Sequence, residues 1–66
     1  MQITVNGQKH EFDMPLNLAA LVEELKLNLK QVAIEHNREI VPRSRFDQVA
    51  LNEGDQVEIV HFIGGG

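Results

Sequence analysis

The sequence ends in the run HFIGGG, in which Gly64, Gly65 and Gly66 follow an apolar stretch. Glycine loses more backbone freedom on ordering than any other residue, so these glycines do not stabilise a fold. The one distinctive chemical group of the run is the α-carboxylate of Gly66. Joining this carboxylate to AMP makes its carbon an electrophile, and glycines pass through a narrow channel and leave the carbonyl unhindered. We therefore expect the glycines to be the working part of the chain.

The remaining reactive residue types show no catalytic or metal-binding pattern. His10, His36 and His61 are far apart and lack the close spacing of zinc ligands. Ser44 has no visible activating base, which argues against a hydrolytic triad. The absence of cysteine removes disulfides, thiolate metal sites and a thiol nucleophile. We expect neither catalytic residues nor a metal site, and thus a protein on which enzymes act.

Length and charge narrow the class of protein further. A chain of 66 residues leaves little room for a deep pocket with its own catalytic shell. The net charge of -4 argues against binding nucleic acid and favours partners with neutral or basic surfaces. No signal peptide is recognisable, and no apolar run approaches the roughly 20 residues that span a bilayer. We expect a cytoplasmic domain, monomeric when free and not bound to membranes.

The first elements form a hairpin followed by a helix. Ile3 and Val5 alternate with polar residues, as in a half-buried strand, and Asn6-Gly7 is a strong signal for a tight turn. A second strand should return through His10 and Phe12. Asn17 can then cap a helix of roughly 9–10 residues, because its side chain can accept a hydrogen bond from a free backbone N–H. An apolar stripe at helical spacing should face the core: Leu18, Leu21, Val22 and Leu25.

The second half of the chain reads as further strands. Residues 31–36 alternate, Asn37-Arg38 makes a turn, and Pro42 ends the short run Ile40-Val41 because proline cannot donate to a ladder. Residues 56–62 form the last and clearest strand. One helix across a mixed sheet buries these stripes economically, which predicts an α+β, ubiquitin-like β-grasp domain. We expect this domain over residues 1–63, with a flexible glycine tail over residues 64–66.

The last strand predicts a docking surface. If Val57 and Ile59 face the helix, then Val60 and Phe62 lie on the outer face of the sheet, beside the tail. An exposed apolar patch next to a flexible tail is typical of an interaction site. We expect a partner to bind this patch and the adjoining Ile63. Arg43 is a further candidate contact, although such exposed arginines are usually solvated.

Two segments carry a resemblance to a known family. The ending VEIVHFIGGG and the central NREIVPRSRF resemble the ThiS family, the sulfur carriers of thiamine biosynthesis, and the resemblance covers essentially the whole chain. Its most specific parts are Gly65-Gly66 and the run Ile40-Val41-Pro42-Arg43, which Asn37 precedes and Phe46 follows. Either part alone is weak, since Gly-Gly ends occur across ubiquitin-like proteins, but together they are specific.

The resemblance implies a chain of reactions carried out by partners. An E1-like adenylyltransferase would use ATP to adenylate the Gly66 carboxylate, with Gly64 and Gly65 threaded into that enzyme. A sulfur donor system would convert the adenylate to a thiocarboxylate, and thiazole synthase would take the sulfur. The protein would then be a cosubstrate that binds no cofactor of its own.

Three alternatives stay open at this point. The first is the sulfur carrier of molybdopterin synthesis, although those chains are generally longer. The second is a ubiquitin-type protein modifier, although such modifiers often carry a basic residue where this chain has Ile63-Gly64. The third is an interaction module with a frayed end.

Overall fold

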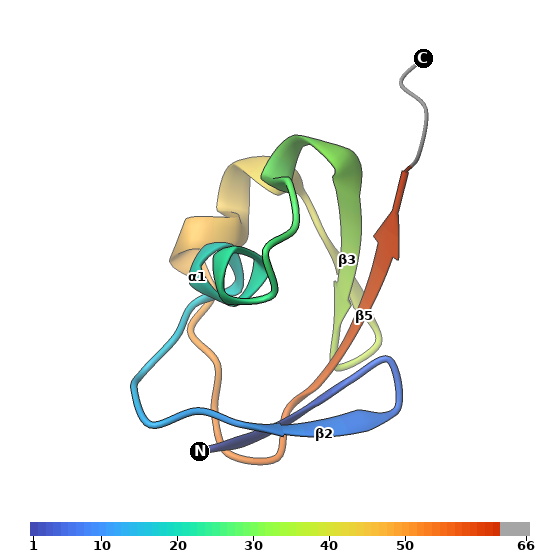
Figure 1. Cartoon of the computed structure of the whole chain (residues 1–66). Helices are drawn as coiled ribbons and strands as arrows, with labels where there is room; N and C mark the ends of the chain where they lie inside the picture. Colours follow the sequence, from blue (N-terminus) through green and yellow to red (C-terminus); the bar gives the residue numbers. More distant parts are fainter. Residues whose placement is uncertain (63–66) are drawn as a thin grey trace.

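A mixed sheet of five strands, in the order β2-β1-β5-β3-β4, carries one α-helix across one of its faces (Figure 1). The computed structural model describes residues 1–62. In chain order its elements are β1 (Gln2–Val5), β2 (Gln8–Glu11), α1 (Leu18–Glu24), the 3-10 helix η1 (Leu29–Gln31), β3 (Val32–His36), β4 (Glu39–Val41), the 3-10 helix η2 (Arg43–Gln48) and β5 (Gln56–His61). Strand β1 is parallel to β5, whereas the pairs β1–β2, β3–β5 and β3–β4 are antiparallel. This is the predicted β-grasp arrangement. The predicted boundary between the domain and the tail, between residues 63 and 64, lies outside the described residues and stays a prediction.

The first hairpin confirms the turn that Asn6-Gly7 predicts. Asn6 and Gly7 have φ values of 49° and 81°, the left-handed conformation that both residues tolerate. Asn6 also joins the hairpin to β5. Its side chain accepts a hydrogen bond from the Ile59 N–H at 2.8 Å and donates one to the Ile59 carbonyl at 3.1 Å. The amide group thereby continues the pairing of β1 with β5 past the point where β1 turns away.

Helix α1 begins as predicted but is shorter than predicted. The Asn17 side chain caps it by accepting a hydrogen bond from the Ala20 N–H at 2.7 Å. The helix ends at Glu24 because Lys26 adopts a left-handed conformation, with φ of 60°. Hydrogen bonds from Lys26 N–H to the Glu23 carbonyl and from Leu27 N–H to the Val22 carbonyl close the end in a Schellman motif.

The predicted apolar stripe faces the core at all four positions, and its last residue is less buried than the other three. Leu18, Leu21 and Val22 are fully buried against the sheet, while Leu25 is the C-cap and only half-buried at the edge of the core. Opposite them, the core side chains of the sheet alternate along three strands: Ile3 and Val5, Val32 and Ile34, Val57 and Ile59.

One core element, η2, was not predicted from the sequence. Pro42 ends β4 as expected, and the chain then winds into the 3-10 helix instead of continuing as irregular structure. This turn buries Phe46, which becomes 2% exposed, and η2 lies beside α1 on the same side of the sheet (Figure 1). In the segment that follows η2, Leu51 is buried and Val49 is half-buried against the core.

Candidate functional site

The two faces of β5 differ as the sequence predicts. Val57 and Ile59 are buried under α1, whereas Val60 and Phe62 are 59% and 54% exposed. Helices α1 and η2 both lie on one side of β3 and β5, and none of the elements within residues 1–62 covers the other side (Figure 1). The expected exposure of Val60 and Phe62 is confirmed, and their role in binding a partner stays a prediction.

The outer face continues the apolar surface onto β3 and β4. Ile40 is 79% exposed, and Ala33 is exposed opposite Val60. Two carboxylates, Glu35 and Glu58, lie on the same face. A shallow hollow of about 140 Å³ opens between these strands, and its lining is Ala33, Ile34, Glu35, Ile40, Glu58 and Val60. The face thus combines aliphatic side chains with acidic ones.

The end of β5 is anchored by a backbone hydrogen bond beyond its last ladder pair. The Phe62 N–H donates to the Gln31 carbonyl at 2.7 Å, which extends the β3–β5 ladder beyond the strand itself. The predicted partner contact Ile63 and the tail residues Gly64, Gly65 and Gly66 follow directly and lie outside the described residues. Backbone pairing therefore fixes the position of Phe62, the last described residue.

The structure brings Arg43 to the same end of the sheet. Its guanidinium donates to the Lys30 carbonyl at 3.0 Å, one residue before the carbonyl that anchors Phe62. Arg43 is exposed, and within residues 1–62 no carboxylate lies within ion-pairing distance of it. Arg45 instead lines a separate depression beside β4, together with His36.

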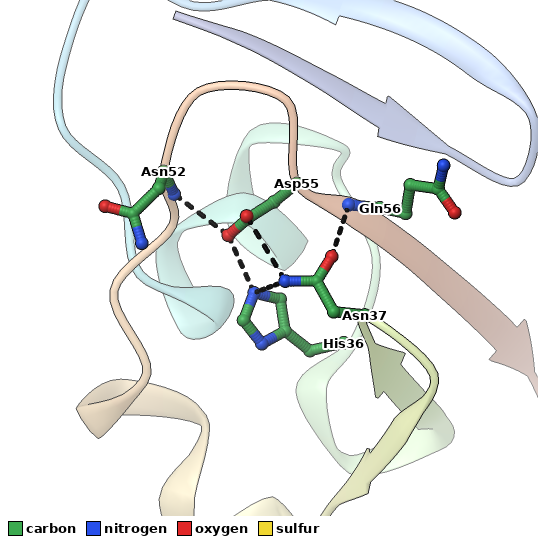
Figure 2. Close-up of polar contacts among 5 residues, drawn as sticks. All are labelled: His36, Asn37, Asn52, Asp55 and Gln56. Atoms are coloured by element: carbon green, nitrogen blue, oxygen red, sulfur yellow. Dashed lines mark hydrogen bonds and ion pairs between the residues drawn. The ribbon is translucent and has the colours of Figure 1, made fainter.

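Sequence reasoning missed a polar network at the start of β5 (Figure 2). The buried carboxylate of Asp55 lies 2.7 Å from His36 Nε2, and it accepts hydrogen bonds from the Asn52 N–H at 2.9 Å and the Asn37 side chain at 3.2 Å. The Asn37 side chain also accepts from the Gln56 N–H at 2.9 Å. These bonds tie the β3–β4 turn to the first residue of β5.

The network changes the acidity of Asp55. Burial by itself would raise the pKa of the carboxyl, but the hydrogen bonds from His36, Asn52 and Asn37 outweigh burial and lower the pKa below its ordinary value of 3.8. Asp55 is therefore a carboxylate at neutral pH that holds loop and strand together. The only hint in the sequence is a turn residue, Asp55, that follows Glu53-Gly54, and nothing in the spacing links it to His36.

No metal-binding cluster forms within residues 1–62. The structure groups no three histidine or acidic side chains in a way that could hold an ion. His36 belongs to the Asp55 network, and the His10 ring stacks on Phe12 with ring centroids 6.2 Å apart. None of the helices in this part of the chain is both long and apolar enough to cross a membrane.

Comparison with known proteins places the chain next to sulfur carriers and thiazole synthases. The model of the ThiS family matches residues 2–66. The chain is 32% identical over its whole length to the sulfur carrier protein ThiS of Escherichia coli, which it also covers completely. It is 47% identical over all 66 residues to a thiazole synthase of Paramagnetospirillum magneticum, of which it spans only 20%. The crystal structure of the thiamine biosynthesis protein (ThiS) of Geobacter metallireducens superimposes with a TM-score of 0.85 at 38% identity, over the full length of both chains.

Proposed function

Because the chain belongs to the ThiS family, we propose that it carries sulfur for thiamine biosynthesis as a thiocarboxylate on Gly66. The observation that carries the proposal is the extent of the family match. The match covers residues 2–66, and it therefore includes both the β-grasp domain and Gly65-Gly66. The sequence resemblance draws on the same two parts, through the run Ile40-Val41-Pro42-Arg43 in the domain and through Gly65-Gly66 at the end.

The proposed chemistry begins with activation of the carboxylate. A carboxylate oxygen of Gly66 attacks the α-phosphate of ATP on an E1-like adenylyltransferase, pyrophosphate leaves, and the acyl-adenylate forms. Sulfide supplied by a donor system then attacks the acyl carbon, AMP leaves, and the thiocarboxylate forms. Thiazole synthase takes the sulfur from this group. The protein itself acts as a cosubstrate without a bound cofactor, and ATP is bound by its partner.

The exposed apolar residues of the outer face support a model in which the folded domain binds the partner and the glycine tail carries the reacting carboxylate. Ordering extended glycines inside a partner disfavours binding by roughly 1–2 kcal/mol of backbone entropy per residue. Contacts elsewhere must offset this entropy, and Val60 and Phe62 offer exposed apolar surface immediately before the glycine segment. Arg43, anchored at the same end of the sheet, is a further proposed contact.

Intact-mass measurement tests the proposal directly. The protein is incubated with the E1-like enzyme, ATP and a sulfide source, and its mass should rise by the difference between sulfur and oxygen. The gain should map to the C-terminal peptide. A mass gain on another peptide, or conjugation of the chain to lysines of other proteins, would contradict the sulfur-carrier function.

Two variants separate binding from chemistry. Deleting Gly66 moves the carboxylate back by one residue, ~3.3–3.6 Å, too far for in-line attack on the α-phosphate. Gly65→Val adds a β-branched side chain to the segment that must enter the enzyme. We expect both variants to bind the E1-like enzyme and to release no pyrophosphate. Normal pyrophosphate release by the Gly66 deletion would refute the assignment of the reacting carboxylate.

A further inference from the structure

Two carboxylates face each other in the middle of the outer face. The register of β3 and β5 places Glu35 directly opposite Glu58, and both side chains are exposed. Side chains directly opposite on one face of a sheet have Cβ atoms about 4.5–5.5 Å apart, where like charges repel. Among residues 1–62, the carboxylates within ion-pairing distance of a basic group are Glu11, beside the N-terminus, and Asp55, beside His36, so neither Glu35 nor Glu58 has such a partner. Within the described part of the chain, no salt bridge therefore offsets the repulsion between these two carboxylates.

Aliphatic side chains surround this acidic pair. Ile40 lies opposite Glu35 on β4, so one row across three strands reads Ile40, Glu35, Glu58. The next row along β3 and β5 pairs Ala33 with Val60. All of these side chains line the same shallow hollow. A ligand in the hollow must therefore satisfy two negative charges while it packs against methyl and methylene groups.

An arginine side chain has this combination of properties. Its planar guanidinium presents five N–H donors that can reach more than one carboxylate oxygen, and it is more weakly hydrated than an ammonium group. Its three methylene groups cover apolar surface while the charge remains at the tip. Charge-assisted hydrogen bonds of this kind are among the stronger polar contacts in proteins. The geometry and charge of the hollow thus match an arginine better than an acidic or purely apolar group.

We propose that the hollow between Glu35, Glu58, Ile40 and Val60 receives an arginine side chain of thiazole synthase. The inference rests on the proposed function. It names the type of side chain with which the partner would bind the outer face of this protein. The choice of thiazole synthase follows from the comparisons, in which a thiazole synthase contains a segment similar to this entire chain. In that relative, a segment similar to this chain and the rest of the thiazole synthase form one polypeptide. The acidic chain, with a net charge of -4, also favours a partner with a basic surface.

The test compares two charge-neutralised double variants by calorimetric titration against thiazole synthase. E35Q/E58Q removes the carboxylates of the hollow, whereas E23Q/E24Q removes two exposed carboxylates of α1, on the opposite face. Both variants change the net charge equally. We expect E35Q/E58Q to weaken binding at least ~10-fold, equivalent to about 1.4 kcal/mol, and E23Q/E24Q to change the Kd less than ~2-fold. The wild-type Kd should also rise with salt more steeply than that of E35Q/E58Q.

A second readout distinguishes a binding role from a structural one. Because removal of the opposed charges relieves repulsion, the urea midpoint of E35Q/E58Q should stay equal to or exceed that of the wild type while its affinity falls. Equal Kd values for the two double variants would overturn the proposal. A loss of affinity in E35Q/E58Q that is accompanied by a lower urea midpoint would also overturn it. So would a loss of affinity confined to the E1-like enzyme, or a wild-type dimer in sedimentation that E35Q/E58Q abolishes.

Sulfur loading of Gly66, measured by intact mass in parallel, keeps the two proposals distinguishable. If the wild type and E35Q/E58Q both acquire sulfur and bind thiazole synthase equally, the arginine site is refuted and the carrier function stands. If the wild type acquires no sulfur, the carrier function is refuted, and the titration still decides whether thiazole synthase occupies the hollow.

Discussion

The two faces of the sheet are built from the same strands, yet they differ in the exposure of their apolar side chains and in the presence of carboxylates. On the inner face, aliphatic side chains from three strands pack against Leu18, Leu21 and Val22 of α1, and almost none of their surface reaches solvent. On the outer face, Ile40, Val60 and Phe62 are each more than half exposed, and carboxylates lie among them. The inner face holds the domain together, while the outer face offers apolar area that folding leaves in water.

Strand β5 contributes side chains both to the core and to the exposed outer face. Its side chains alternate, so Val57 and Ile59 enter the core while Glu58 and Val60 face outward. A slip of one residue in its register would exchange the two sets. The bonds from Asn37 and Asn6 to the β5 backbone, together with the Asp55 network, fix that register. The comparison teaches that polar contacts at the sheet's ends determine which apolar residues are available to a partner.

The largest expected effect comes from truncation on the inner face. Leu21→Ala should lower the free energy of unfolding by roughly 2–5 kcal/mol, because it leaves a cavity under a fully buried side chain. Urea unfolding measures the loss. Ile40→Ala is the matched control on the outer face and should change stability by less than about 0.5 kcal/mol. A loss below about 1 kcal/mol for Leu21→Ala would show that this face contributes less than its burial indicates.

The next effect concerns the network that fixes β5. Asp55→Asn should cost about 1.5–3 kcal/mol at pH 7, since it removes charge-assisted hydrogen bonds to His36, Asn37 and Asn52. The folded-state pKa of Asp55 is lowered, so its stabilisation is present above the unfolded pKa, about 3.9, and is lost as the pH falls through the folded value. Urea unfolding from pH 7 to pH 2.5 should show the two proteins converging below about pH 4. A constant difference across this range would contradict the assignment.

A smaller effect is expected on the outer face, in binding alone. Phe62→Ala should weaken affinity for the E1-like enzyme and for thiazole synthase by at least ~1 kcal/mol, because it removes exposed apolar area beside the tail. The melting curve should remain that of the wild type. Unchanged affinity for both partners, with normal melting, would remove this residue from the docking surface.

The smallest effect has the opposite sign. Glu58→Gln should raise the free energy of unfolding by about 0.2–1 kcal/mol, because Glu35 then no longer faces a like charge. The gain should shrink in high salt, which screens exposed charges. Glu24→Gln, on the solvent side of α1, serves as the control and should change stability by less than about 0.5 kcal/mol. A loss of stability for Glu58→Gln would show that this carboxylate has a stabilising role.

Local patterns in the sequence were sufficient for most of the fold and for the outward-facing residues. The Asn6-Gly7 turn, the Asn17 cap, the inward side chains of the last strand and the exposed Val60 and Phe62 were all predicted and are confirmed. Each depends on residues close together in the chain, because periodicity, capping and turn conformation are local. The predicted helix of roughly 9–10 residues was longer than the seven residues of α1, because a left-handed Lys26 carries no signal comparable to glycine.

The sequence by itself determined the class of fold, the glycine end and the family, since those depend on residue type and order. Tertiary structure alone decided the partners of Asp55, the burial of Phe46 and the meeting of Glu35 with Glu58. The physical reason is separation along the chain. Residues 18 to 23 positions apart become neighbours only when strands pair in one register, and that register depends on core packing together with the polar contacts at the ends of the sheet.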